Sequence, residues 1–583
     1  MRSLSRPDKG GDATPFGLSL GQTGWGTVLL GFVIFGLLWI LDTPYREFYV
    51  PNALDVPALA DGLLLAPGAH WQDWFTRGYS NFWDVYPEWP PGNTQFTRPV
   101  FQFVIYLAHF ALGRNWELYR IIGCFAAASV PAVAFLIARM ALGLRTGLSL
   151  LAAVLVVLSP PILDCWKFGL ANAHELLTTF LVACAFLAVV ARHDFLCLML
   201  LFMALLTKEN AVWAPAAAAL TIMLRPKPAE PLRHQAIAAA AMFLPVVVWL
   251  GLRFAFFDGI GGTYVTAGYT PLGDFLALTF KKLRTLDALF VGQPHFALEG
   301  PSGADRAIAF GTRLLTYALF SLLALRIMPE TGNRLRNAIR ERRWPTVEAA
   351  FLVPLWAAIA LAFHFTLALT WTRYATSVVV FAWPALVAEI DRRRRTVLWL
   401  GLTVFCVVST LRSYFSIEFE PPDPRGYPAM NAALHQTPMA TRQVYVLAEV
   451  GDALPFANPE YVRLILGVPA EIVRIIDIDW NCAGPNNLVA FDHSITDGVV
   501  NLTAMLPACA NFIFLAHIGD EALANGQLYR NATMSYELPE ASPKQKWSFE
   551  VGRRITVYVR PSGPARFIIQ HGGPNGIAWF DTP

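Results

Sequence analysis

The sequence predicts a mainly α-helical fold, in which a polytopic transmembrane module is followed by a smaller soluble α/β domain. Of the 583 residues, 55% are hydrophobic and only 15% are charged, whereas soluble globular chains carry roughly a quarter charged residues. The mean hydropathy is +0.44. Long apolar runs recur through the first 416 residues and then stop. We therefore expect a polar tail at 1–23, a transmembrane module at 24–416 and a soluble domain at 417–583.

Apolar runs of membrane-spanning length recur along the module. A spanning helix needs roughly 20 apolar residues, and about eleven runs qualify or come close. The runs at 195–207 and 210–225 are short, so we expect them to be tilted as a pair or one of them to be broken. The expected spans are 24–41, 116–141, 146–162, 174–191, 195–207, 210–225, 236–257, 306–328, 346–369, 373–390 and 396–415.

Arginine clusters set the expected orientation of these spans. Segment 326–343 holds six arginines, and 392–395 is four arginines in a row. With the N-terminus in the cytoplasm, every strong basic cluster falls on one side, as the positive-inside rule requires. The long loop 42–98, the loop 258–305 and the C-terminal domain then lie outside the cytoplasm.

One further apolar segment, 99–113, is predicted not to cross the membrane. It has only 15 residues, and counting it as a span would place the arginine runs outside. We expect a helix lying along the outer interface, with Pro99 favouring its first turn.

Several classes of protein are disfavoured by composition and motif. The net charge of +3 follows the membrane topology and does not suggest a nucleic-acid partner. The sequence contains no phosphate-binding glycine loop, zinc pair or nucleophile elbow. Cys482 and Cys509 can pair in a disulfide if the C-terminal domain is outside the cytoplasm. The first apolar run has no cleavage site after it, so we expect a retained span.

Ionisable groups near a membrane are costly, and each is a functional hypothesis by default. They gather at four places on the predicted outer side, where interfacial flanking, structural ion pairs and helix capping are the alternative explanations. Arg98 is the natural phosphate ligand, because a guanidinium binds phosphate in a bidentate manner. The candidates are Asp42 and Glu47 after the first span; Asp84 and Arg98 in the long loop; Asp164, His174 and Glu175 after the third span; and Lys208 and Glu209, with Arg373 and Tyr374 further on.

Three stretches resemble the GT-C-fold glycosyltransferases that take sugar from a polyprenyl-phosphate carrier. The closest likeness is to protein O-mannosyltransferases and their bacterial relatives. The stretch 96–100, Phe-Thr-Arg-Pro-Val, resembles the family's Arg-Pro motif, and 160–175 resembles its second acidic motif. The stretch 205–210, Leu-Leu-Thr-Lys-Glu-Asn, resembles its Lys-Glu motif. The likeness covers about 24–225 well and the later spans loosely.

The resemblance implies a multi-pass enzyme of a bacterial inner membrane, with its C-terminal domain in the periplasm and its active site on the outer face. Asp42 occupies the family's catalytic position and would act as general base in an inverting displacement. Arg98, Lys208 and Arg373 would bind the donor phosphate. Asp164, His174 and Glu175 would orient the acceptor, which is a glycan, glycolipid or protein, or hold a divalent metal such as Mg or Mn.

The chain departs from the family pattern in two ways. The family usually has paired acids after the first span, whereas Asp42 stands alone and Glu47 follows five residues later. Asp55, Asp73 and Asp84 therefore remain rival bases. The C-terminal domain shows no 34-residue period, so it is not a tetratricopeptide array.

The C-terminal domain contains short runs typical of strands and one possible helix, near 459–466. The strand-like runs are 443–447, 472–477, 487–491, 512–515 and 554–559. These runs predict a small α/β domain, which would bind the acceptor or cover the active site.

Two other functions are compatible with a polytopic chain. A flippase or transporter for lipid carriers would show two similar halves and polar groups near mid-span. A non-catalytic scaffold would not need carboxylates and cations converging on one face. The polar groups gather at outer span ends and no internal repeat is evident, which favours the glycosyltransferase.

Overall fold

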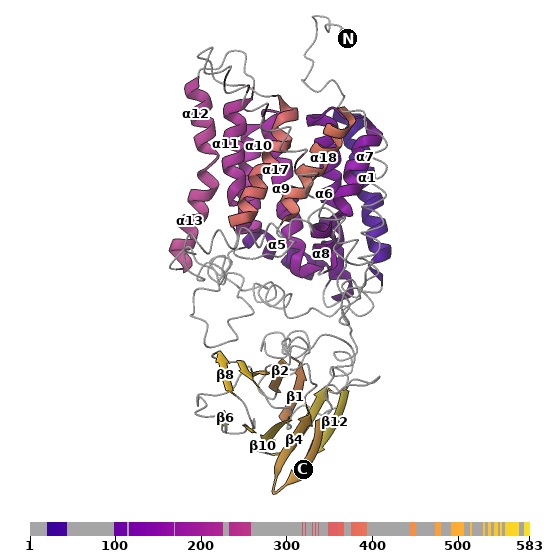
Figure 1. The fold of residues 1–583 in the computed structure, drawn as a ribbon, viewed down its shortest axis with the longest axis vertical. Helices are drawn as coiled ribbons and strands as arrows, with labels where there is room; N and C mark the ends of the chain where they lie inside the picture. The colour runs from indigo at the N-terminus through magenta and orange to yellow at the C-terminus, as the bar shows by residue number, and fades with distance from the viewer. Residues whose placement is uncertain are drawn as a thin grey trace, which may run out of the picture.

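A computed structural model shows a helical bundle with strands beyond one end of it (Figure 1). Figure 1 also places α5 and α8 at the end of the bundle that faces the strands. The residues that the structure describes are 20–43, 98–112, 116–167, 169–225, 232–257, 348–366 and 375–392, five isolated positions between 318 and 336, and, toward the C-terminus, 443–449, 473–479, 491–505, 513–515, 529–530, 534–537, 542–545, 548–550, 554–561, 563–570 and 577–582.

The helices follow the apolar runs of the sequence. They are α1 (Leu20–Leu41), α5 (Pro99–Leu112), the 3-10 helix η2 (Trp116–Tyr119), α6 (Arg120–Leu136), the π-helix η3 (Ile137–Ala141), α7 (Thr146–Val157), α8 (Pro160–Lys167), α9 (Leu170–Val190), α10 (Asp194–Thr207), the 3-10 helix η4 (Glu209–Trp213), α11 (Ala214–Leu224), α12 (Leu232–Ala241), α13 (Leu244–Phe257), α17 (Ala349–Thr366) and α18 (Thr376–Arg392).

Four of the described helical segments are long and apolar enough to cross a membrane, and a fifth qualifies if a bent pair is counted as one span. Within the described residues, every expected span coincides with helix. The spans expected at 306–328 and 396–415 fall almost wholly outside those residues. The fold class predicted from the sequence, a mainly helical polytopic membrane protein, is confirmed.

The third expected span differs from its prediction. Residues 146–162 do not form one straight helix, because α7 ends at Val157 and α8 begins at Pro160, bent away by 57°. Proline cannot donate the backbone hydrogen bond that would continue α7. Residues 160–167 therefore form a separate short helix that leads to the start of α9.

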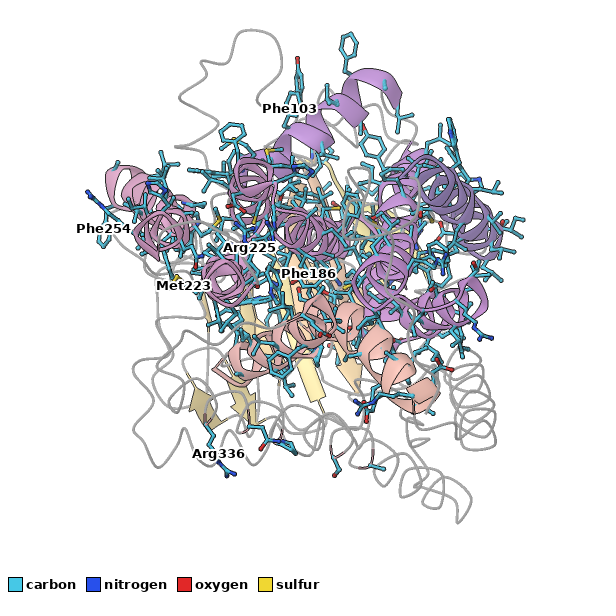
Figure 2. The ribbon with its side chains drawn as sticks, turned by 90° about the horizontal axis from the view of Figure 1, so that it is seen from above. Phe103, Phe186, Met223, Arg225, Phe254 and Arg336 are labelled. Carbon is cyan, nitrogen blue, oxygen red and sulfur yellow. The ribbon has the colours of Figure 1, made fainter. Side chains whose placement is uncertain are left out.

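Helix α5 lies across the bundle, in agreement with the interfacial helix expected at 99–113. In Figure 2, which looks along the bundle, most helices are seen end-on, whereas the helix carrying Phe103 is seen from the side. Phe101 and Ile105 are buried, while Phe103 and Phe110 are exposed. A helix that buries one face and exposes large apolar side chains on the other is suited to a membrane interface.

The bundle core combines small residues with one aromatic group. Alanines on α6 and α9, such as Ala127 and Ala183, are fully buried, and small residues allow membrane helices to approach closely. Phe186 of α9 packs edge-on against Trp356 of α17 and Phe381 of α18, at 5.2 and 5.3 Å between ring centroids. The late helices α17 and α18 therefore close onto the early ones.

A partly buried ion pair joins three helices at the end of the bundle away from the strands. Both oxygens of Asp194, at the start of α10, accept 2.6 Å hydrogen bonds from Arg225, which follows α11. Arg225 also donates to the Val189 carbonyl of α9 at 2.7 Å. The end of α9, the start of α10 and the end of α11 thus share one face, as the alternation of spans predicts.

The described strands form two sheets. A seven-stranded mixed sheet has the order β12-β11-β1-β2-β5-β9-β8, and a five-stranded antiparallel sheet has the order β3-β4-β10-β7-β6. The strands are β1 (Gln443–Glu449), β2 (Val473–Asp479), β3 (Phe491–Thr496), β4 (Val499–Met505), β5 (Ile513–Leu515), β6 (Tyr529–Arg530), β7 (Met534–Glu537), β8 (Ser542–Gln545), β9 (Ser548–Glu550), β10 (Arg554–Val559), β11 (Ala565–Gln570) and β12 (Ile577–Thr582).

Four of the five strand predictions coincide with described strands, and the fifth lies mostly outside the described residues. The runs expected at 443–447, 472–477, 512–515 and 554–559 coincide with β1, β2, β5 and β10 in the described residues. Of the run expected at 487–491, only Phe491 is described, and it is the first residue of β3. The hairpin turn Asp497–Gly498, in which both residues have positive φ, explains why β3 and β4 pair about it. The helix expected near 459–466 and both Cys482 and Cys509 lie outside the described residues.

Candidate functional site

Arg98 forms the first element of a buried polar group at the strand-facing end of the bundle. It immediately precedes Pro99, the first residue of α5, and its carbonyl accepts the first helical hydrogen bond, from Gln102 at 3.0 Å. Its guanidinium donates two hydrogen bonds to the Glu209 carboxylate, one from Nη2 to Oε1 at 2.9 Å and one from Nε to Oε2 at 3.3 Å. Two segments that are 111 residues apart in the sequence are thus joined.

Glu175 and Lys208 form the second ion pair of this group. Lys208 ends α10 in an extended conformation, and its ammonium contacts Oε1 of Glu175, in the second turn of α9. The other oxygen, Oε2, accepts a 2.6 Å hydrogen bond from the amide of Asn210. Glu175 is buried and held from two sides, so it is a fixed part of the group.

His174 lies between the two cations. Its Nε2 is 2.9 Å from Nζ of Lys208 and 3.4 Å from Nη1 of Arg98. Arginine and lysine can only donate, so Nε2 must accept and the ring proton belongs on Nδ1. The edge-on ring of Phe101, 5.2 Å away, packs against the imidazole. We call Arg98, His174, Glu175, Lys208, Glu209 and Asn210 the Arg98–Lys208 cluster.

Electrostatics within the cluster favours the ionised form of Glu209. For Glu209, burial alone would raise the pKa, but the charges of Arg98 and Lys208 outweigh it and hold the pKa at about 2. For Lys208, burial lowers the pKa of the ammonium, although the charge of Glu175 acts in the opposite direction. The cluster therefore contains a lysine whose charged form would be favoured by a further anion.

Arg253 adds a third cation to the surroundings. It lies on α13 within electrostatic range of both Arg98 and Glu209, and it is buried. Our sequence reasoning missed it, although an arginine inside the apolar run 244–257 was a visible signal.

Asp42 is part of a second buried group at the same end of the bundle. It follows α1, with its amide hydrogen-bonded to the Leu38 carbonyl at 2.8 Å. Its carboxylate accepts from Arg120 Nη2 at 2.6 Å and from Nε at 2.8 and 3.0 Å. Side-chain exposure is 0% for Asp42 and 4% for Arg120. Arg120 also donates to the Trp166 carbonyl at 3.2 Å, which ties α1 and α6 to α8.

Gly169 makes room for Arg120. Its φ is +59°, and a Cβ at this position would stand 2.6 Å from Nη1 of Arg120. The Gly169 backbone also approaches Gly123 of α6, where an added Cβ would stand 3.1 Å from it. The turn between α8 and α9 therefore leaves space for the Arg120 side chain. His174 lies four residues after Leu170, the first residue of α9, which is about 6 Å along the helix at 1.5 Å rise per residue. The Asp42–Arg120 pair and the Arg98–Lys208 cluster therefore flank the same turn.

Gly169→Ala is expected to destabilise the protein more than Gly143→Ala. Both glycines have positive φ, and placing alanine there costs about 1–3 kcal/mol of backbone strain. Gly143 has open space around it, whereas Gly169 contacts Arg120. Thermal unfolding of the two purified variants checks this difference. Equal losses would mean that the Gly169–Arg120 contact adds no stability.

The carboxylates of Asp42, Glu175 and Glu209 do not fit a divalent metal, which the resemblance had raised for the acidic motif. Both oxygens of Asp42, Glu175 and Glu209 are occupied by cationic or amide donors. Within the described ranges, no three His, Cys, Asp or Glu side chains group in a way that could hold a metal. We therefore assign no step to a metal.

The remaining candidates from the sequence are only partly placed. Asp164 lies half-buried on α8. Six other candidates fall outside the described residues: Glu47, Asp55, Asp73, Asp84, Arg373 and Tyr374. The structure therefore brings Arg98, His174, Glu175, Lys208 and Glu209 into one cluster and places Asp42 in a separate ion pair.

Fold and site together define a polytopic helical membrane protein with buried cation–carboxylate groups at one end of its bundle. No protein-family model matches the chain, and no curated protein matches it. Among solved structures, ArnT from Cupriavidus metallidurans is similar in its apo state (TM-score 0.40, 14% identity, 78% of this chain and 86% of that chain).

Two further solved structures are similar to the same extent. ArnT from Cupriavidus metallidurans bound to undecaprenyl phosphate gives a TM-score of 0.40 at 14% identity, over 79% of this chain and 93% of that chain. The apo oligosaccharyltransferase of Archaeoglobus fulgidus gives 0.41 at 12% identity, over 77% of this chain and 64% of that chain. At these TM-scores the likeness carries no argument.

Proposed function

We propose that the protein is a membrane glycosyltransferase that moves a monosaccharide from a polyprenyl-phosphate carrier to an acceptor hydroxyl. The proposal rests on one observation: the buried side chains of Arg98 and Lys208 both contact His174 at the end of an apolar bundle. Two buried cations at that position suit a phosphate whose lipid chain lies in the membrane.

The proposed chemistry is a single inverting displacement. The acceptor oxygen attacks the anomeric carbon and its proton passes to the Asp42 carboxylate. The bond from the anomeric carbon to the phosphate oxygen breaks, and its electron pair stays on the phosphate. Arg98 and Lys208 stabilise the negative charge that develops there. Arg120 holds the Asp42 carboxylate in place with three hydrogen bonds to its two oxygens.

The proposed reaction takes place on the outer face of a plasma membrane. The distribution of arginines supports this side of the membrane, because the clusters expected in the cytoplasm lie at the opposite ends of the spans from Asp42 and Arg98. The strands lie beyond the same end of the bundle as α5 and α8 (Figure 1), which suits a role in receiving a glycan, glycolipid or protein acceptor.

Donor turnover by the full-length protein in nanodiscs tests the proposal. Radiolabelled polyprenyl-phosphate sugars, presented singly with candidate acceptors, should be consumed and yield polyprenyl phosphate. Heat-inactivated protein is the control. If the protein moves such lipids across a bilayer but consumes none of them, it is a flippase. If it neither binds nor consumes them, the scaffold alternative stands.

A further inference from the structure

The fork of Arg98 onto Glu209 occupies the edge of the guanidinium that a phosphate would use. Nε and Nη2 of Arg98 each reach a different oxygen of the Glu209 carboxylate. Carboxylates and phosphates bind this edge in the same bidentate manner. Glu209 and a lipid phosphate would therefore compete for Arg98.

Burial distinguishes the two carboxylates of the cluster. Glu175 has 0% side-chain exposure and is held by Lys208 and Asn210, whereas the side chain of Glu209 is 28% exposed. Because the Glu209 side chain already contacts water, it can leave the cluster for a hydrated position more readily than the fully buried Glu175 can. Arg98, at 6% exposure, would stay behind.

Charge balance supports an exchange. With Glu209 in place, the three cations Arg98, Lys208 and Arg253 face two carboxylates. A sugar phosphodiester carries one negative charge and can replace the Glu209 carboxylate without changing the sum. After transfer the product phosphate monoester carries up to two, and the extra charge would be met by the excess cation. Leaving Arg98 without any anion would cost more than either arrangement.

We propose that Glu209 is an internal phosphate substitute, which holds Arg98 before the donor arrives and is displaced by the carrier phosphate. This inference rests on the proposed function, since it assumes that Arg98 binds the donor phosphate. When product leaves, Glu209 returns to Arg98 and so competes with the polyprenyl phosphate. The carboxylate thereby weakens product binding and speeds its release.

Binding of undecaprenyl phosphate to the full-length protein in nanodiscs tests the exchange. Glu209→Gln keeps the shape but not the charge, and a charged hydrogen bond exceeds a neutral one by about 1.4 kcal/mol, so this variant should bind on the order of tenfold more tightly. Glu389→Gln is the matched control. Glu389 is a buried carboxylate paired with Arg392 at 2.9 Å at the end of α18, and its loss should leave binding unchanged.

Each outcome decides one point. Equal or weaker binding by Glu209→Gln would overturn the exchange, while weaker binding by Arg98→Ala would still uphold the phosphate site. Unchanged binding by Arg98→Ala would instead remove the phosphate assignment of the proposed function. Undecaprenol and inorganic phosphate, as competitors, separate recognition of the lipid chain from recognition of the phosphate.

A measurement on the wild-type protein avoids any dependence on the folding of variants. Carbodiimide labels exposed carboxylates, so the labelling of Glu209, measured by peptide mass spectrometry, should rise when undecaprenyl phosphate is added. Labelling of Glu175 should stay low throughout. Constant labelling of Glu209 at saturating undecaprenyl phosphate would also overturn the exchange.

Discussion

Asp42→Asn is expected to lower the rate of sugar transfer by about two to four orders of magnitude, the usual contribution of a general base. Asparagine has nearly the same shape and can still accept hydrogen bonds from Arg120, but it cannot take up the acceptor proton. Single-turnover transfer in nanodiscs, at saturating donor and acceptor, measures the chemical step directly.

The rival explanation for Asp42 is a structural ion pair, and the chain offers a matched control for it. Both carboxylate oxygens of Asp194 also accept hydrogen bonds from a buried arginine, Arg225, at the opposite end of the bundle. Asp194→Asn should also lower stability, because each substitution leaves a buried arginine without its counter-charge, yet it should leave the rate of transfer intact. If both variants keep the wild-type rate, Asp42 is not the base.

The fold was largely predictable because membrane spans are governed by local composition. About 20 apolar residues and a one-sided distribution of arginine are visible without any knowledge of long-range contacts. The bend between α7 and α8 was missed because the apolar run continues across it to Ile162, and only the Pro160–Pro161 pair signals a break. The C-terminal strands were harder, because runs as short as β6 and β8 carry little periodicity.

The site was predictable as a set of residue types but not as a set of pairs. Arg98, Glu175 and Lys208 stood out as ionisable groups beside apolar runs, whereas nothing in the sequence pairs Arg98 with Glu209 instead of with a loop carboxylate. Arg120 was passed over because an arginine at the start of an apolar run resembles ordinary interfacial flanking. Its partner Asp42 is 78 residues away in the sequence. Gly169, which leaves space for Arg120, is recognised only by its positive φ in the structure.

Arg98→Ala is expected to lower the rate of transfer by about two to three orders of magnitude, the cost of removing one donor to a developing oxyanion. In the proposed reaction, charge builds up on the phosphate oxygen as its bond to the sugar breaks. Arg98 is buried beside Lys208, where little water is available to take its place. Arg98→Lys keeps the charge but loses the fork, so we expect a loss between those of wild type and alanine.

The dependence on the leaving group separates this role from simple packing. A donor whose phosphate leaves as a weaker base needs less stabilisation. The ratio of wild-type to Arg98→Ala rates should therefore shrink with a donor in which an aryl phosphate replaces the polyprenyl phosphate as the leaving group. Arg225→Ala removes an equally buried arginine from the opposite end of the bundle, and any loss it causes should be the same for both donors. A ratio for Arg98→Ala that does not change with the leaving group would mean that Arg98 supports the fold of α5 and does not act on the phosphate.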